Sequence, residues 1–324
     1  MYALGIESTA HTFGIGIVDE KGNVLANEKM TYTNPDAGIH PRLAAEFHLA
    51  NGKNVLTRAL NTANLSINDM DVIGFAQGPG LGPCLRVGAI TARYLSTLAN
   101  KPILGVNHCV AHISIGKNKT PSTNPVVVYT SGANTQIIAE ENGKYRVLGE
   151  TLDMGVGNAL DQFGRKLGLG FPAGPVIDEN YFLGKKYIPL PYSVKGMDLV
   201  FAGLLTEATS QIGKHDVNDL CYSFMHTAFC MVAEVTERAL AHSEKKEVLV
   251  TGGVAASRAL THILQKLCDE RGATLHVVPR AYAMDNGAMI AWQTLLEHRG
   301  GRKQRMEDTQ VEQRYRTDHV DIFW

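Results

Sequence analysis

The stretch VVVYTSGANTQIIAEENGKYRVLGET, residues 126–151, marks the point at which the chain begins a second β-rich region. It contains three short β-type runs separated by turn residues, a pattern typical of a meander. The N-terminus has the same form, with YALGIE, FGIGIVD and NVLANEKMTYT in succession. Each meander then gives way to alternating helix and strand, so the sequence predicts an internal repeat of topology. We therefore expect two α/β domains that face each other across a cleft.

The segment GKNKTPSTNP, residues 116–125, separates the two repeats. It is polar and contains two prolines, which is typical of a break between periodic regions. A chain of 324 residues is long enough for two domains. We expect an N-terminal domain of residues 1–120 and a C-terminal domain of residues 121–324, with a C-terminal helix that can pack back on the first domain.

The composition is that of a globular protein with a formal net charge of -1. Any contact with nucleic acid must therefore use a local basic patch. The odd number of scattered cysteines, without a C-x-x-C, argues against a disulfide framework and indicates a reducing compartment. No secretion signal or membrane-length apolar run is visible, so we expect a soluble, cytoplasmic protein. The basic clusters are Lys117 and Lys119, Lys185 and Lys186, and Arg299, Arg302, Lys303 and Arg305.

The stretch VNHCVAHI, residues 106–113, places two histidines four residues apart, on one face of a predicted helix. The spacing alone leaves three readings open: metal ligands, a pair that handles protons, or two ordinary polar side chains. Near the C-terminus, Asp285 stands just before an apolar helical pattern. Local sequence favours a helix-capping role for that carboxylate.

Three loops of small residues stand at strand ends: residues 5–12, 129–136 and 251–260. Backbone N–H groups in such loops can approach phosphate or ribose oxygens, although a tight turn also needs glycine. Neither common glycine-rich nucleotide fingerprint follows a strand here, which disfavours the folds that carry them. Asp161 and Asp178 lie in the glycine-rich middle of the second half, and their carboxylates could bind ribose hydroxyls or cap helices.

Nine motifs taken in order resemble one family. They are the GIEST opening, AGIHPRLAAEFH, QGPGLGPCLRVG, NHCVAH, YTSGANTQ, GNALDQFGRKLGL, PAGPVID, TGGVAASRAL and DNGAMIA. Together they are similar to the tRNA N6-adenosine threonylcarbamoyltransferases, called TsaD in bacteria and forming the catalytic subunit of the KEOPS complex in archaea and eukaryotes. The tail QRYRTDHVDIFW resembles the archaeal and eukaryotic members. The resemblance implies an α/β, actin-like ATPase (ASKHA) fold, with two RNase H-like domains around a nucleotide cleft.

The resemblance also implies a function. Such an enzyme transfers the threonylcarbamoyl group from threonylcarbamoyl-AMP to N6 of adenosine 37 in tRNAs that read ANN codons, forming N6-threonylcarbamoyladenosine. The implied partners are tRNA, a Bud32-like kinase/ATPase and small KEOPS-type subunits, one of which would dock near residues 42–64. No membrane is implied, and no catalytic base is assigned.

The resemblance assigns the histidines to one metal ion per chain, iron in preference to zinc. Two imidazoles with oxygen ligands suit a borderline ion of this kind better than magnesium. The implied metal ligands are His108, His112, Tyr129 and Asp285. The implied nucleotide ligand is threonylcarbamoyl-AMP, or ATP in its place. Its implied binding residues are Tyr129, Thr130, Ser131, Gly132, Ala133, Asp161, Gly174, Asp178 and Ser257.

Some positions depart from the family pattern and leave the individual nucleotide contacts open. They are Ala133 and Ala173 for glycine, Asp178 for glutamate, Ala202 for serine and Ser257 for asparagine. Three other functions compete. A zinc peptidase would need H-E-x-x-H, and Cys109 stands where its glutamate belongs. A sugar kinase of this fold would need a carboxylate base, which we cannot identify. A nucleotide-hydrolysing, nucleic-acid-binding switch or scaffold would keep the loops without an open metal position.

Overall fold

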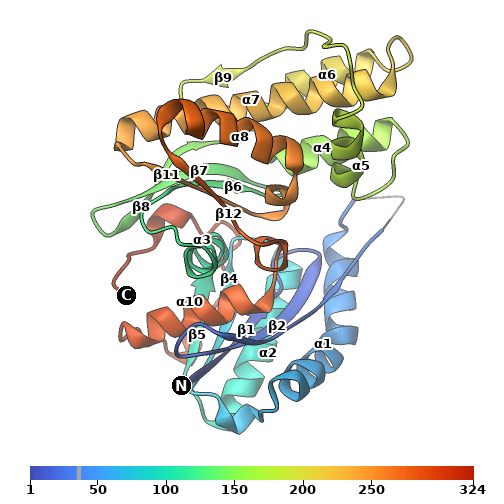
Figure 1. The fold of residues 1–324 in the computed structure, drawn as a ribbon. Helices are drawn as coiled ribbons and strands as arrows, with labels where there is room; N and C mark the ends of the chain where they lie inside the picture. The colour runs from blue at the N-terminus through green and yellow to red at the C-terminus, as the bar shows by residue number, and fades with distance from the viewer. Residues whose placement is uncertain (35–37) are drawn as a thin grey trace. The chain divides into compact units, whose positions relative to one another are not determined.

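The computed structural model describes residues 1–34 and 38–324, and they form two compact units (Figure 1). The first unit comprises Met1–Lys119, Gly143–Tyr145 and Met284–Trp324. The second comprises Thr120–Asn142 and Arg146–Ala283. The last 41 residues, 284 to 324, thus belong to the first unit, although they follow the second unit in the chain.

The first unit is built on a five-stranded sheet with the order β3-β2-β1-β4-β5. The three N-terminal strands pair antiparallel, and β4 and β5 continue the sheet in parallel to β1. Apolar residues occupy both faces of the central strands, as expected for a sheet covered on both sides. The strands are β1 (Tyr2–Glu7), β2 (Thr12–Asp19), β3 (Val24–Thr31), β4 (Val72–Gly78) and β5 (Ile103–Asn107).

Helices cover both faces of this sheet. The long helices α1 (Pro41–Ala63) and α2 (Gly82–Ala99) pack on the face that carries Leu4 and Ile6, and they enclose the larger apolar core. On the other face lie α10 (Gly287–Arg299) and α3 (His108–Lys119), with Ala3 in the smaller core cluster. Short 3-10 turns complete the unit: η1 (Ile67–Asp69), η3 (Met306–Asp308) and η4 (Thr317–His319).

Glycines let α10 lie directly on the sheet. A Cβ at Gly5 would lie 2.0 Å from the backbone nitrogen of Ala291, and one at Gly16 would lie 2.1 Å from that of Ala288. No side chain can occupy such a space, so the contact is between backbones. This close approach draws the residues that precede α10 towards the end of the sheet where α3 begins.

The second unit repeats the strand order of the first, as β12-β11-β6-β7-β8. Strand β7 is antiparallel to β6, whereas β11 and β12 extend the sheet in parallel. The repeat of topology expected from the two meanders is therefore confirmed. The strands are β6 (Val126–Thr130), β7 (Thr135–Glu141), β8 (Lys144–Glu150), β11 (Glu247–Thr251) and β12 (Thr274–Val277), with a small hairpin of β9 (Val194–Lys195) and β10 (Asp198–Leu199).

The helices of the second unit lie between and after these strands. The longest, α7, is capped by the Asp216 side chain, which accepts hydrogen bonds from the N–H groups of Asn218 and Asp219. Helix α7 packs against α5 and α8. The helices are α4 (Val156–Lys166), α5 (Gly174–Tyr181), α6 (Ala202–Ser210), α7 (Val217–Ser243), α8 (Arg258–Arg271) and α9 (Arg280–Ala283), with the 3-10 turn η2 (Gly253–Ala256).

Two further sequence expectations are tested by the fold. All five cysteines are free thiols, as their spacing predicts. Within residues 1–34 and 38–324, no helix combines the length and the apolar character needed to cross a membrane.

Candidate metal centre and nucleotide loops

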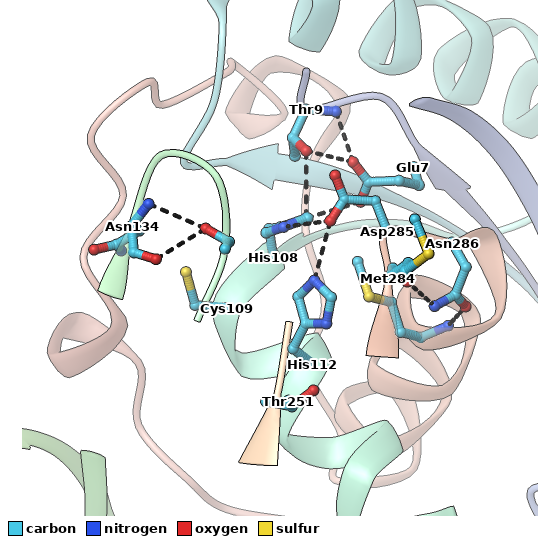
Figure 2. A network of polar contacts seen from close by, with 12 residues as sticks. Glu7, Thr9, His108, Cys109, His112, Asn134, Thr251, Met284, Asp285 and Asn286 are labelled. Carbon is cyan, nitrogen blue, oxygen red and sulfur yellow. Dashed lines mark hydrogen bonds and ion pairs between the residues drawn. The ribbon is translucent and has the colours of Figure 1, made fainter. Parts of the chain in front are cut away.

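Three side chains that the sequence separates widely meet in the first unit (Figure 2). His108 is the first residue of α3, His112 lies one turn further along, and Asp285 precedes α10. One ligand atom from each lies within 4.8 Å of the other two. His108 is 5% exposed and His112 is fully buried. This geometry brings together three of the four residues proposed as metal ligands.

The local structure at each helix start explains why these side chains are available. The Asn107 side-chain oxygen accepts hydrogen bonds from the N–H groups of Cys109 and Val110, at 2.9 and 3.1 Å, and so caps α3. Asn286 caps α10 by accepting from the N–H of Met289 at 3.0 Å. The local prediction that Asp285 caps α10 is therefore wrong. Since Asn286 fills that role, the carboxylate of Asp285 faces the histidines.

The donor atoms converge around the Asp285 carboxylate. Its Oδ1 lies 3.2 Å from Nε2 of His112 and 3.5 Å from Nε2 of His108. The two imidazole rings are 4.7 Å apart between centroids and almost perpendicular. Two imidazole nitrogens and a carboxylate oxygen form a donor set suited to iron or zinc. The residues present therefore fit a metal ion of that class.

Glu7, which the sequence analysis did not single out, completes the cluster from the end of β1. Its Oε2 lies 2.9 Å from Nδ1 of His108, and its Oε1 accepts hydrogen bonds from the N–H and hydroxyl of Thr9, at 2.7 and 2.5 Å (Figure 2). A carboxylate on Nδ1 fixes the tautomer and ring orientation of a histidine and leaves Nε2 for a metal. The only signal in the sequence is an acid at the end of the apolar run YALGIE, and the structure shows that acid to be fully buried.

The charged groups of the cluster and their burial shift the pKa values of the two histidines and of Asp285. Burial opposes protonation of His108, but the carboxylates of Glu7 and Asp285 outweigh it and raise the pKa of His108 to about 9. Burial lowers the pKa of His112. Burial alone would raise the pKa of Asp285, yet His108 and His112 hold it well below its usual range. The carboxylates of Glu7, fully buried, and Asp285, 17% exposed, thus lie against the two imidazoles, and a divalent cation would balance their charge.

Tyr129 belongs to the second unit, where it lies near the end of β6. Its side chain is 2% exposed, and it pairs in the sheet with Gln136 of β7 and Thr251 of β11. The small-residue loop follows directly. Thr130 is fully buried, and the N–H of Ser131 donates to the carbonyl of Asn134 at 2.8 Å, which closes a turn around Gly132 and Ala133.

The start of α4 supports this loop. The N–H of Gly157 donates to the carbonyl of Ser131 at 3.1 Å, and that of Asn158 donates to Gly132 at 3.0 Å. A Cβ at Gly155 would lie 2.5 Å from the Gly132 carbonyl oxygen, so this junction requires glycine. The first N–H groups of α4 are thereby used to shape the loop.

Two aspartates proposed as nucleotide contacts also organise the second unit. Asp161 accepts a hydrogen bond from the N–H of Ala173 at 2.8 Å and so anchors the segment that leads into α5. Asp178 is 7% exposed and accepts from the hydroxyl of Ser257 at 2.5 Å. Nothing in the unit lies within 4 Å of the position that a Cβ at Gly174 would take, so the backbone there is open.

The contact between Asp178 and Ser257 links two departures from the family pattern. Asp178 also accepts from the N–H of Ala259 at 3.0 Å, and Ser257 caps α8 by accepting from the N–H of Leu260 at 3.2 Å. A hollow of about 670 Å³ opens beside this junction, within the ~300–1,000 Å³ range of small-molecule sites. Its lining residues include Phe182, Ala255, Ala256, Arg258, Thr261, His262 and Arg280.

Sequence comparison gives these sites a context. The sequence profile of the TsaD family, tRNA N6-adenosine threonylcarbamoyltransferase, matches residues 22–292. The protein named tRNA N6-adenosine threonylcarbamoyltransferase in Thermococcus kodakarensis is 53% identical over 100% of both chains. Its namesake in Thermofilum pendens is 47% identical over 99% of this chain and 96% of its own. A probable bifunctional tRNA threonylcarbamoyladenosine biosynthesis protein of Methanothermobacter thermautotrophicus is 50% identical, and the match covers 100% of this chain and 61% of that protein.

Structural comparison confirms the fold class. HypF of T. kodakarensis superposes with a TM-score of 0.65 at 13% identity, over 91% of this chain and 47% of that one. Component A of the (R)-2-hydroxyglutaryl-CoA dehydratase from Acidaminococcus fermentans superposes with a TM-score of 0.58 at 15% identity. The superposition covers 92% of this chain and 98% of that one. At such low identity the likeness concerns the fold alone, which is the expected actin-like ATPase (ASKHA) fold.

Proposed function

This chain belongs to the TsaD family of tRNA N6-adenosine threonylcarbamoyltransferases, and we propose that it transfers the threonylcarbamoyl group from threonylcarbamoyl-AMP to N6 of adenosine 37 in tRNA. The observation that carries the proposal is the buried group of His108, His112 and Asp285, held in place by Glu7. That group occurs in a chain that matches transferases of this name along its whole length.

We propose that His108, His112, Asp285 and Tyr129 hold one metal ion, iron in preference to zinc. The chemistry of the donor set supports this choice of ion class. When bound, such an ion supplies a Lewis acid for the carboxylate, hydroxyl and carbonyl oxygens of a threonylcarbamoyl group. Glu7 orients His108, and Asn107 and Asn286 hold the two helix starts from which the ligands project.

We propose that the second unit binds the adenylate half of the donor. The buried carboxylates there suit ribose or base contacts, and the open backbone at Gly174 allows close approach of a ligand. The N6 nitrogen would form a bond to the carbamoyl carbon, and the bond between that carbon and the phosphate oxygen of AMP would break. AMP would leave with the electron pair of that bond, and the proton lost by the amine would pass to water. Positioning is the main contribution of the chain to this step, an effect worth ~7–11 kcal/mol in well-oriented reactions. The proposed contacts are Tyr129, Thr130, Ser131, Gly132, Ala133, Asp161, Gly174, Asp178 and Ser257.

A helical partner is proposed for the first unit. On α2, Ile90, Tyr94 and Leu98 share one face and are 59%, 64% and 60% exposed. The exposed Leu43 and Leu49 lie on α1, which packs against α2. Such an apolar stripe is typical of a surface that a partner covers. It extends the docking face expected at residues 42–64 to include α2, and a small KEOPS-type subunit is the proposed occupant.

A second partner is suggested by the bifunctional relatives. The chain accounts for 61% and 60% of the length of two proteins named as bifunctional in threonylcarbamoyladenosine biosynthesis. A second activity is therefore joined to a chain of this kind in those proteins. We propose that a separate Bud32-like kinase/ATPase serves this chain in the cytoplasm.

A single-turnover assay tests the proposed function. Purified protein is mixed with threonylcarbamoyl-AMP, unmodified tRNA and the partner proteins, and modified adenosine and AMP are measured. We expect AMP release only with tRNA, and loss of transfer together with metal content in His112→Ala. ADP release from ATP without tRNA, and no transfer, would favour the nucleotide-switch alternative. Full metal content and wild-type transfer in His112→Ala would refute the metal site.

A further inference from the structure

A small aromatic pocket lies in the second unit, apart from the nucleotide loops. One wall is α7, which presents Tyr222 and His226 one turn apart. The other wall is the segment that follows α5, which contributes Tyr187 and Tyr192. The pocket has a volume of about 260 Å³, and Thr227 and Cys230 complete its lining.

Hydrogen bonds hold the pocket walls in place. The hydroxyl of Tyr187 lies 3.0 Å from that of Thr227, and the hydroxyl of Tyr192 donates to the carbonyl of Cys230 at 3.1 Å. The N–H of Ile188 donates to the Ser223 hydroxyl at 2.8 Å and fastens the loop to α7. Because the hydroxyls of Tyr187 and Tyr192 are engaged at the edges, their aromatic rings form the walls.

The geometry of the rings suits a flat, aromatic guest. The rings of Tyr222 and His226 lie 5.3 Å apart and are inclined by only 31°. The Tyr187 ring stands almost perpendicular to both, at 85° and 75°. Burial lowers the pKa of His226, with help from Lys266 and His262, so its ring is neutral at physiological pH. At a volume below the ~300–1,000 Å³ of typical small-molecule sites, the pocket suits one ring system.

Positive charge surrounds this pocket. Lys185 and Lys186 are exposed and directly precede Tyr187 in the loop. Lys266 and His262, exposed on α8, are close enough to affect the protonation of His226. Two acids near these walls are already engaged: Glu234 by the hydroxyl of Tyr192 and by Arg238, and Asp219 by the backbone N–H groups of Lys185 and Lys186. A cationic guest is therefore disfavoured, and an aromatic group attached to an anion is favoured.

We propose that this tyrosine pocket binds one unpaired base of the RNA substrate, with the adjoining phosphates on Lys185, Lys186 and Lys266. Unpaired bases stack on aromatic side chains, and flanking phosphates pair with lysine or arginine. A nucleobase with its phosphates matches the pocket in size, flatness and charge. The inference rests on the proposed function insofar as that function makes tRNA the substrate.

The test measures binding of an unmodified tRNA transcript to the full chain together with its partner proteins. Tyr187→Ala removes one stacking wall at an exposed position, and it should weaken tRNA binding by about 5- to 150-fold, the equivalent of one stacked base. Tyr187→Phe keeps the ring and should restore most of the affinity. Lys185→Gln with Lys186→Gln should lower the dependence of log Kd on log salt by about 1–2. Lys21→Gln, at an exposed position outside the proposed docking face, is the charge control and should leave tRNA affinity unchanged.

Each result has one reading. If Tyr187→Ala and the double lysine variant bind tRNA with wild-type affinity and salt dependence, the inference is wrong. If Tyr187→Ala loses a partner protein while its own tRNA affinity is unchanged, the pocket is a protein-docking site and the inference is also wrong. Wild-type transfer to tRNA is measured in parallel. If the wild-type protein transfers no threonylcarbamoyl group to tRNA, the proposed function is wrong. If it does transfer the group, but the pocket variants bind tRNA normally, only the inference about the pocket is wrong.

Discussion

Single side chains at the metal cluster act through charge and hydrogen bonding. His108 touches carboxylates through both ring nitrogens, with Glu7 on Nδ1 and Asp285 near Nε2. Such a histidine is held in one orientation before any ion binds, which reduces the entropy lost on binding. The role of Glu7 is therefore to position a metal ligand.

Removing the charge of Glu7 should loosen the metal. Glu7→Gln keeps the size of the side chain but gives His108 a weaker hydrogen-bond partner. We expect metal affinity to fall by about 10- to 100-fold, as measured by competition with a chelator. Glu20→Gln, at a position where the carboxyl side chain is 62% exposed, is the control. Equal affinity in Glu7→Gln and wild type would show that Glu7 does not orient the ligand.

His48 makes a second prediction at this scale. It is fully buried beside the ring of Phe13. Burial lowers its pKa from 6.5 to about 4. The unfolded chain therefore takes up a proton first as the pH falls. The stabilising contribution is complete above pH 6.5 and declines towards pH 4, by up to about 3 kcal/mol.

Denaturant unfolding at several pH values measures this effect. His48→Leu removes the titrating group, so the difference in unfolding free energy between wild type and variant should change between pH 7 and pH 4. The wild type should lose more stability than the variant over that range. Parallel curves for the two proteins would show that His48 is protonated equally in the folded and unfolded states.

Among the secondary-structure elements, the packing of α10 against the sheet determines the position of Asp285. The backbone of α10 touches β1 and β2 at Gly5 and Gly16, where a Cβ has no room. Since Asp285 lies two residues before the first residue of α10, a shift of the helix would move the carboxylate away from His108 and His112. The packing of α10 on the sheet thus controls the geometry of the metal cluster.

Gly16→Ala tests this packing. The new methyl group would lie 2.1 Å from the Ala288 backbone nitrogen, and relief requires movement of α10. We expect a loss of about 3 kcal/mol in unfolding free energy, with reduced metal content. Gly203→Ala on α6 is the matched control, because nothing lies within 4 Å of its Cβ position. A variant Gly16→Ala as stable as wild type, with full metal content, would contradict the argument.

For the whole molecule, the exposed apolar stripe on α2 predicts an assembly. Tyr94 is 64% exposed at its centre. Tyr94→Ala should weaken binding of the helical partner while leaving the unfolding free energy within about 0.5 kcal/mol, as expected at an exposed position. Titration calorimetry and denaturant unfolding check the two outcomes. Equal partner affinity in Tyr94→Ala and wild type would mean that the partner docks elsewhere.

The repeated topology and the family could both be predicted from the amino-acid sequence. The two meanders predicted two similar sheets because alternation and turn residues are local properties that neighbouring residues enforce. The position of His108 and His112 on one face of a helix likewise follows from their four-residue spacing and the periodicity of a helix. What the spacing left open was whether the pair binds a metal, and the family resemblance favoured that reading.

The family resemblance implied that Asp285 joins those histidines, whereas the contact of Glu7 with His108, and the way in which Asp285 reaches the cluster, came from the tertiary structure alone. Local sequence could not distinguish Asp285 from Asn286 as the cap of α10, since both side chains accept hydrogen bonds from a helix start. The contact depends on a backbone-to-backbone approach at Gly5 and Gly16, between segments that are nearly the whole chain apart. The pairing of Asp178 with Ser257 is also set by packing. Such long-range contacts form through the summed packing of both segments, and no local pattern records them.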